Sequence, residues 1–300
     1  MISETISVMI PCYNSSATLP RALASLIAQS HQNWEALIID DGSTDHPEKV
    51  VEAFSDPRLR YFRHSENKGR AQARELALQK MQGDYLTMLD ADDWLIPEKF
   101  TLQMQVLKDN PQLALVSSGM FLETVERKLA GLSSPRESKD LIIYPPLKKP
   151  RPLPIPHAPI LVRREALKNR HYDISLNYSE DLDFFLPILM EYSYALISRP
   201  LYTYAYEENR SFLRLTSQLR SHRKIFAKYF KNYPLTIFWR ILITFPKNLM
   251  AMILYSWPLQ SWWAQRGLTS NLPEDDVAYL SSKERVSEVL ITRFREPTGA

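Results

Sequence analysis

Short apolar runs alternate with amphipathic segments along the first 118 residues of the chain. The apolar runs predict buried strands, and the segments between them carry apolar residues at helical spacing, which predicts helices packed on a core. We expect strands at 6–11, 34–40, 59–63, 84–89 and 113–118, and helices at 17–30, 47–54, 69–81 and 97–110. This alternation is typical of an α/β fold in which helices cover a mostly parallel sheet.

The pattern becomes less regular after residue 118. Seven of the 21 prolines lie between 144 and 159, so we expect a loop or extended chain there. Further elements are expected as a strand at 158–162, a helix from about Ser179, strands at 192–198 and 201–206, and basic helical structure from about Leu215. The last 25 residues contain acidic side chains again and predict a polar helix with a loose end.

Polar clusters directly follow three of the predicted strands. They are Cys12-Tyr13-Asn14, Asp40-Asp41-Gly42 and Asp90-Ala91-Asp92-Asp93. In open parallel sheets, ligands bind beyond the carboxyl ends of the strands, so we expect these segments to surround a ligand. The chain contains neither GxGxxG nor GxxxxGKS/T, which removes the main support for a dinucleotide site or a P-loop.

The acidic turn after the fourth strand has two interpretations. Asp90 and Asp92 are two residues apart, so their carboxylates can face one small volume, where their repulsion favours a counter-ion. Mg²⁺ or Mn²⁺ would meet that need and would usually complete its shell with substrate phosphate oxygens. The alternative is a solvated turn in which Asp92 or Asp93 caps a short helix before Pro97.

Two further acidic segments each allow a structural and a chemical interpretation. Asp41 could accept hydrogen bonds from a base or a ribose, but an ordinary Asp-Gly turn and a cap before Pro47 explain the same residues. Asp181 could act as a general base toward an acceptor hydroxyl. Equally, Ser179 is a suitable N-cap, and Glu180 and Asp181 suit the positive end of a helix.

Charge is unevenly distributed, although the formal net charge is only +3. Between Glu208 and Glu274 there are ten basic residues and no acidic one, which leaves 27 basic and 34 acidic residues, a net of −7, in the rest of the chain. This asymmetry indicates an anionic partner.

The single cysteine, Cys12, excludes an intramolecular disulfide and cysteine-rich zinc modules. No basic region precedes the first apolar run, so we expect no secretory signal.

Five segments occur in a familiar order: ISVMIPCYN, ALIIDDGSTD, NKGRAQARELAL, GDYLTMLDADDWLIP and SEDLDFF. Through them the chain resembles the family 2 glycosyltransferases over roughly residues 5–205. The resemblance implies a GT-A catalytic domain over 1–214, with a nucleotide-sugar half (1–118) and an acceptor half (119–214), followed by a helical extension over 215–300. The QxxRW motif of processive synthases is absent, so the resemblance is to non-processive enzymes of the bacterial cell-envelope type.

The resemblance also implies roles for individual residues. Those near the nucleotide-sugar donor, for which a UDP-sugar is favoured, would be Pro11, Tyr13, Asp41, Asn67, Arg74 and Asp90. Asp41 would bind the base, and Asn67 and Arg74 would lie near the nucleotide and diphosphate. Asp92 would be the direct ligand of Mn²⁺ or Mg²⁺, with Asp90 between the metal and the ribose.

Asp181 matches the catalytic base of this family, which implies a direct displacement that inverts the anomeric centre of the transferred hexose. The acceptor would be a hydroxyl group of a glycan or of a lipid-linked molecule. No histidine metal ligand is recognisable downstream. Arg210 could meet the diphosphate or be an ordinary surface residue, and His157 could face the acceptor or be structural. The alternatives to this activity are a nucleotidyltransferase and a non-catalytic, membrane-associated nucleotide-binding protein.

The region 210–266 combines its basic residues with four of the six tryptophans. Such a composition suits a helix in the headgroup layer of an anionic membrane, which would place the protein peripherally at the cytoplasmic face. A helical subdomain packed on protein is the alternative. The longest uncharged stretch, 248–265, is interrupted by polar residues and is too short to span a bilayer. No nucleic-acid-binding motif accompanies the charge, and the sequence carries no signal for an oligomeric state.

Overall fold

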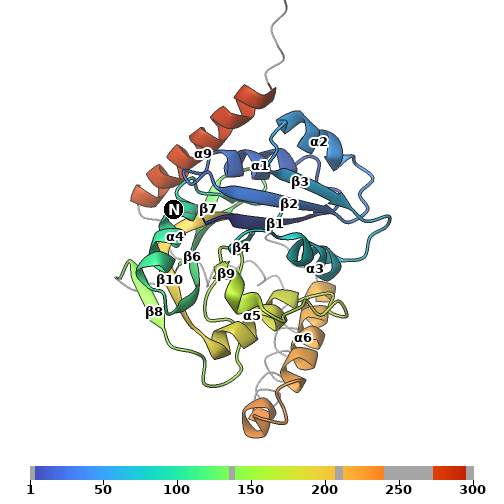
Figure 1. Ribbon diagram of the computed structural model, residues 1–300, viewed down its shortest axis with the longest axis vertical. Coiled ribbons are helices and arrows are strands. Elements are labelled where there is room, and N and C mark those ends of the chain that lie inside the picture. Colours follow the sequence, from blue (N-terminus) through green and yellow to red (C-terminus); the bar gives the residue numbers. More distant parts are fainter. Residues whose placement is uncertain (1–3, 135–138, 207–211, 240–272, 295–300) are drawn as a thin grey trace, which may run out of the picture.

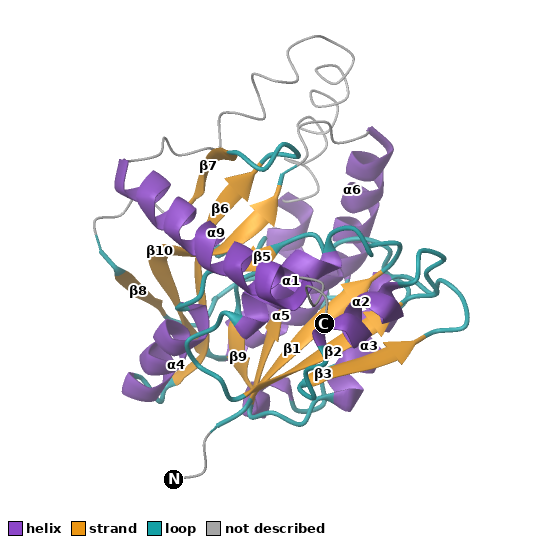
Figure 2. Ribbon diagram, turned by 90° about the horizontal axis from the view of Figure 1, so that it is seen from above, coloured by secondary structure: helices purple, strands orange, loops and turns teal. Residues whose placement is uncertain are grey.

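The structure is a computed structural model that describes residues 4–134, 139–206, 212–239 and 273–294 (Figure 1). Its centre is one mixed sheet with helices on both faces. Within the described residues the strand order is β3-β2-β1-β4-β9-β6-β10-β5, with β7 beside β6 and β8 beside β10 (Figure 2). The predicted α/β class is therefore confirmed.

The first half contains the elements that the apolar pattern predicts. Its strands are β1 (Ile6–Cys12), β2 (Trp34–Asp40), β3 (Leu59–Arg63) and β4 (Tyr85–Met88). Its helices are α1 (Leu19–Ile27), α2 (Pro47–Phe54), α3 (Arg70–Lys80) and α4 (Lys99–Asp109). These four strands are parallel where they pair, and the chain crosses over through one helix between each strand and the next.

Helices on both faces explain why β1 and β2 are apolar at almost every position. Successive side chains of β1 point to opposite faces. Val8 and Ile10 pack in the cluster that includes α1 and α4, whereas Met9 packs with α3 and α5 (Glu180–Glu191). The sequence of a strand that is buried on both faces is a continuous apolar run, without alternation of apolar and polar residues.

The second half departs from the predicted pattern. Its elements are β5 (Trp94–Leu95), β6 (Leu113–Glu123), β7 (Leu129–Ser133), β8 (Leu141–Tyr144), β9 (Leu161–Arg163), a 3₁₀ turn (Arg164–Leu167), α5 and β10 (Ser193–Ala205). The two strands expected at 192–198 and 201–206 are one strand, β10. Its pairing with β6 is irregular around Pro200, which has no N–H to donate.

The two described C-terminal helices pack at different places on the fold. Helix α6 (Phe212–Ala227) lies beside α5, and α9 (Pro273–Phe294) packs on α1 and α2 (Figures 1 and 2). Tyr279 of α9 donates a hydrogen bond to Glu123, and its ring lies tilted against that of Trp94 with the ring centroids 5.8 Å apart. Within the part of the chain that the structure describes, we find no helix with both the length and the hydropathy needed to cross a bilayer. The uncharged stretch 248–265 lies outside the described residues.

Candidate active site

The three polar segments meet at one edge of the sheet. β1 pairs in parallel with β2 on one side and with β4 on the other, and Cys12 is opposite Asp40 in the register. The turns that follow these strands must therefore lie next to one another at the carboxyl edge. This edge is the place where the predicted ligand contacts can come together.

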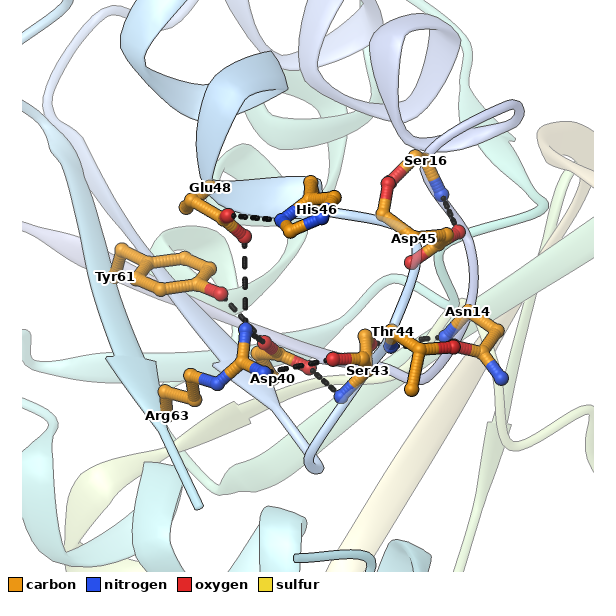
Figure 3. Close-up of polar contacts among 10 residues, drawn as sticks. All are labelled: Asn14, Ser16, Asp40, Ser43, Thr44, Asp45, His46, Glu48, Tyr61 and Arg63. Atoms are coloured by element: carbon orange, nitrogen blue, oxygen red, sulfur yellow. Dashed lines mark hydrogen bonds and ion pairs between the residues drawn. The ribbon is translucent and has the colours of Figure 1, made fainter. Parts of the chain in front are cut away.

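Asp40, the first acid of the DDGS segment, is a structural residue. Its carboxylate is fully buried and accepts hydrogen bonds from Tyr61 Oη (2.6 Å), Arg63 Nη1 (2.9 Å) and the Ser43 N–H (2.8 Å) (Figure 3). Burial raises the pKa of Asp40, but these donors more than offset that effect, so the pKa lies below its ordinary value. These hydrogen bonds hold the turn after β2 in place on its buried side.

The loop after β1 is tied to the same turn by a ladder of hydrogen bonds (Figure 3). The Asn14 N–H donates to Ser43 Oγ (2.9 Å), and the Thr44 N–H donates back to Asn14 Oδ1 (2.9 Å). One step further, the Ser16 N–H donates to Asp45 Oδ2 (2.8 Å). These bonds hold the two loops as a single unit beside the sheet edge.

Asp41 fixes the start of α3. The side chain is buried, and Oδ1 accepts from the Lys68 N–H (2.9 Å) and lies 2.8 Å from His64 Nδ1. Oδ2 accepts from the Gly69 N–H at 2.7 Å. A carboxylate offers about four acceptor positions, so three partners from the chain leave room for one more. The predicted role of Asp41 toward a base would have to use that remaining position.

Gly42 permits the close approach of this turn to the segment before α3. Its φ is +77°, and a Cβ there would lie 2.6 Å from the Glu66 carbonyl carbon and 2.8 Å from Asn67 N. The candidate residue Asn67 is exposed at this contact. Of the two candidates from β1 and its loop, Pro11 is buried within the strand, whereas the Tyr13 side chain is about half exposed.

The DADD turn divides its carboxylates between solvent and core. Asp90 is partly exposed and Asp92 is exposed, whereas Asp93 is buried and accepts from Tyr202 Oη (2.6 Å) and the Ala205 N–H (2.7 Å). Burial, and then the charges of Asp90 and Asp92, raise the pKa of Asp93 well above its ordinary value. The helix cap considered for Asp92 or Asp93 does not form, because the chain enters β5, which pairs with β10.

Arg74 joins the DADD turn to the start of α5. Its guanidinium is buried, and Nη1 donates to Asp181 Oδ1 (2.5 Å) and to Glu180 Oε1 (2.8 Å). Nη2 donates to Asp90 Oδ1 at 3.1 Å. Burial lowers the pKa of Arg74, but the three carboxylates raise it by more, so the side chain stays charged. One cation thus holds the first acid of the DADD turn and the acids at the start of α5.

Asp181 lies at the entrance of α5 with its second oxygen toward His157, whose Nε2 is 3.5 Å away. Burial raises the pKa of Asp181, and Arg74 followed by His157 more than offsets this, so the pKa lies below its ordinary value. Asp181 is therefore an ionised proton acceptor at neutral pH. The expected capping by Ser179 is wrong: Ser179 has φ +61° and its side chain makes no cap hydrogen bond.

Asp181 and Asp90 open into one cavity of about 560 Å³. Its polar lining consists chiefly of Arg70, Arg74, Asp90, His157, Glu180 and Asp181. Its apolar and aromatic lining includes Leu153, Ile155, Tyr178, Tyr204 and Tyr206. The remaining candidates, Pro11, Tyr13, Asp41, Asn67 and Asp92, do not line this cavity, and belong to the neighbouring sheet edge and turns.

The donor set at the DADD turn fits a divalent cation that shares its ligands with a substrate. Among the described residues, no group of three or more His, Cys, Asp or Glu side chains could enclose a metal. Asp90 and Asp92 offer two accessible carboxylates, whereas Asp93 is turned into the core. Mg²⁺ is usually bound in this way, by one or two carboxylates together with substrate phosphates and water.

Three contributors to the site were not assigned these positions from the sequence. The sequence marks Glu180 only as a helix-terminal acid and leaves the role of His157 open, and the family resemblance implies that Arg74 lies near the nucleotide and diphosphate. The structure buries Arg74 between the carboxylates of Asp90, Glu180 and Asp181. A basic residue on the otherwise apolar side of a predicted helix was the available signal. Arg210 lies outside the described residues.

Sequence comparisons agree with this geometry. Residues 7–170 match the family described as "Glycosyl transferase family 2". An uncharacterized glycosyltransferase of Haemophilus influenzae is 28% identical over 260 residues, which are 84% of this chain and 95% of that protein. The Escherichia coli UDP-Glc:alpha-D-GlcNAc-diphosphoundecaprenol beta-1,3-glucosyltransferase WfgD is 34% identical over 105 residues, which are 35% of this chain and 42% of that protein.

Solved structures share the fold. Staphylococcus aureus TarS 1–349 in complex with UDP-GlcNAc aligns with a TM-score of 0.64 at 16% identity, over 96% of this chain and 90% of that one. The mannosyltransferase PcManGT of Pyrobaculum calidifontis, in complex with GDP-Man and Mn²⁺, aligns with a TM-score of 0.56 at 17% identity, over 93% and 86%. With more than half of its length matched to the family, the chain belongs to glycosyl transferase family 2 and is a nucleotide-sugar-dependent glycosyltransferase with the GT-A fold.

Proposed function

We propose that this enzyme moves one hexose from a UDP-sugar to a hydroxyl group of a lipid-linked glycan, with inversion at the anomeric carbon and with Mn²⁺ or Mg²⁺ as cofactor. The observation that carries the proposal is the Arg74 bridge, which holds Asp90 and Asp181 in one cavity. Single-step transfer needs a metal-binding acid for the donor and a base for the acceptor within one site, and the bridge supplies that proximity.

Asp181 is the proposed catalytic base. Its pKa lies below the ordinary value because Arg74 and His157 outweigh the effect of burial, so the carboxylate is available at neutral pH. It removes the proton of the acceptor hydroxyl as that oxygen attacks the anomeric carbon. Arg74 keeps one carboxylate oxygen fixed, and the other faces the cavity beside His157. Holding the base in one orientation reduces the entropy that the reaction must otherwise lose.

The donor is proposed to lie along the carboxyl edge of β1, β2 and β4. Asp90 and Asp92 would hold the cation, and Pro11, Tyr13, Asp41 and Asn67 would contact the nucleotide. A bound divalent cation would offset the negative charge that grows on the departing nucleoside diphosphate. The UDP-sugar is favoured because WfgD is named for UDP-Glc and TarS is bound to UDP-GlcNAc, whereas PcManGT binds GDP-Man with Mn²⁺.

The acceptor is proposed to enter the 560 Å³ cavity from the side of the 152–158 segment and α6. Aromatic residues such as Tyr178, Tyr204 and Tyr206 line this cavity, and faces of this kind suit sugar rings as well as apolar groups. The name of WfgD gives a diphosphoundecaprenol-linked sugar as its acceptor, which supports a lipid-linked molecule here.

The division at 214 and 215 remains our proposed boundary between the catalytic domain and its extension.

The test is a panel of nucleotide sugars, each scored for thermal stabilisation of the protein with and without Mn²⁺. We expect metal-dependent stabilisation by UDP and by one or a few UDP-sugars. The favoured donor is then incubated with lipid-linked glycans, and the released nucleotide is identified. Release of UDP with a lengthened glycan supports the proposal. Release of pyrophosphate would show a nucleotidyltransferase, and an absence of metal-dependent stabilisation by every nucleotide would contradict the donor assignment.

A further inference from the structure

Four exposed apolar side chains follow one another along the chain just beyond the C-terminal end of α6, and two of them, Phe238 and Trp239, pack edge to face with ring centroids 6.2 Å apart. Phe230, Leu235, Phe238 and Trp239 are 52%, 74%, 56% and 56% exposed. These four are among only eleven large apolar side chains that are exposed in the described part of the chain, yet they lie within ten consecutive positions. Single exposed apolar residues are ordinary on a protein surface, whereas a cluster of large ones marks an interaction site. We call these four residues the aromatic surface.

Basic side chains flank the aromatic surface. Arg220, Arg223 and Lys224 are exposed on α6, and Lys231 is exposed within the surface itself. The sequence has no acidic residue between Glu208 and Glu274, although the rest of the chain carries a net charge of −7. Aromatic side chains are common both in protein–protein interfaces and in the headgroup layer of membranes, but protein interfaces are depleted of lysine, whereas Lys and Arg beside aromatic side chains suit an anionic membrane. The charge therefore favours a lipid surface as the partner.

The aromatic surface is linked to the catalytic cavity through α6. Gln218 and His222 of this helix line the cavity that contains Asp181. Directly after α6, Lys228 Nζ donates to Asp183 Oδ1 (2.7 Å) of α5 and to Asp173 Oδ2 (2.9 Å). From Gln218 to Ala227, the last residue of α6, the helix rises nine residue steps, or about 14 Å along its axis. The aromatic surface therefore follows directly, along the chain, on the helix that forms one wall of the cavity (Figure 1).

We propose that the aromatic surface, with the basic side chains of α6, is a docking site for an anionic lipid bilayer. Docking there would place the α6 wall of the cavity next to the headgroups, where the sugar of a lipid-linked acceptor lies. The inference deepens the proposed function, since it rests on a lipid-linked acceptor for its purpose. Binding to lipid itself requires neither donor nor acceptor, so it can be tested independently of the transfer reaction.

The experiment is flotation of the full-length protein with two kinds of vesicle, phosphatidylcholine alone and phosphatidylcholine mixed with phosphatidylglycerol. One variant combines Phe238→Ser with Trp239→Ser, and a second combines Arg223→Glu with Lys224→Glu. The matched control combines Val277→Ser with Leu280→Ser, which removes two equally exposed apolar side chains from α9. Thermal unfolding shows whether each variant is folded.

We expect the wild type and the control to float with anionic vesicles and not with neutral ones, and to be released by salt. Each variant of the aromatic surface or its basic flank should lose roughly tenfold or more in partitioning. Equal binding by wild type and variants would overturn the proposal. So would a wild type that does not float but forms a dimer in sedimentation, with Phe238→Ser/Trp239→Ser monomeric, because the surface would then join two copies.

The proposed function is read out separately, as sugar transfer to a water-soluble acceptor fragment. If docking fails while this transfer proceeds, only the membrane inference is wrong. If docking succeeds and no sugar is transferred to any acceptor, the proposed function fails and the docking surface remains.

Discussion

Replacing Arg74 by methionine probes the bridge at the centre of the site. The guanidinium is 2% exposed and pairs with Glu180, which is also 2% exposed, with Asp181, and with the more accessible Asp90. Methionine has a similar length and no charge, so the variant leaves two buried carboxylates without their cation. Removing one partner of a buried ion pair typically costs about 3–5 kcal/mol of unfolding free energy. We expect Arg74→Met to lose an amount in this range at neutral pH.

The pH dependence of that loss has a defined sign. In the wild type the pKa of Asp181 lies below its ordinary value, so the bridge contributes stability at neutral pH and loses it as the pH falls through the folded pKa. In Arg74→Met, burial is opposed only by weaker neighbours, so the pKa of Asp181 rises. The difference in unfolding free energy between the two proteins should therefore shrink toward acid pH, where the carboxylates are protonated in both.

Two assays follow from this reasoning: urea unfolding over a range of pH, and the pH profile of kcat for sugar transfer. In Arg74→Met the acidic limb of the kcat profile should move to higher pH, because the base is harder to ionise. Arg74→Lys retains a cation but not the planar fork that reaches three carboxylates, so it should recover part of the stability and part of the shift.

Arg70→Met is the matched control. Arg70 is on the same helix and lies 3.7 Å from Glu180, but its side chain is 48% exposed, so its loss should cost only about 0–1 kcal/mol. If Arg74→Met were no less stable than Arg70→Met, and its acidic limb were unmoved, the bridge would not set the state of the base.

Three more predictions concern other parts of the molecule. Asp92→Asn should abolish Mn²⁺-dependent donor turnover and change the unfolding free energy much less than Arg74→Met does, because Asp92 is exposed; wild-type turnover in a Mn²⁺ titration would reject Asp92 as a metal ligand. Burial lowers the pKa of Lys99 from 10.5 to about 7, so unfolding free energy should rise between pH 7 and 9 by at most ~1.4 kcal/mol per unit. In Lys99→Met, urea unfolding should show a smaller rise of unfolding free energy with pH. An equal rise in both proteins would contradict the lowered pKa of Lys99. Tyr279→Phe removes the hydrogen bond from α9 to Glu123 and should cost about 1–2 kcal/mol, whereas wild-type thermal stability would show that α9 does not depend on it.

The first half of the fold was predictable because its signals are local. Trp34–Asp40 is an apolar run closed by an Asp-Gly turn, and the structure ends β2 at Asp40. Pro47 marks the first turn of α2 because a proline there sacrifices no helical hydrogen bond. The meeting of the three polar segments also followed from the sequence, since parallel neighbours share a carboxyl edge.

The second half depends on contacts that no local pattern encodes. β5 has only two residues. It directly follows Asp93, whose buried carboxylate accepts hydrogen bonds from Tyr202 and the Ala205 N–H, more than a hundred positions later in the chain. β10 continues past Pro200 because β6 pairs with it on both sides of the irregularity. Arg74 illustrates the same point in the site. Its carboxylate partners come from the DADD turn and from the start of α5, and only the tertiary structure, in which α3 and α5 share one core cluster, reveals that it serves both.

The most direct measurement is made on Asp181→Asn, which keeps the shape of the side chain and removes its basicity. Sugar transfer and the affinity for UDP in the presence of Mn²⁺ are measured on the same preparation, the latter by calorimetry. We predict a loss of transfer of roughly 10²- to 10⁴-fold, with the UDP affinity nearly unchanged. Transfer at the wild-type rate would contradict the assignment of Asp181 as the base, and with it the account of how the cavity works.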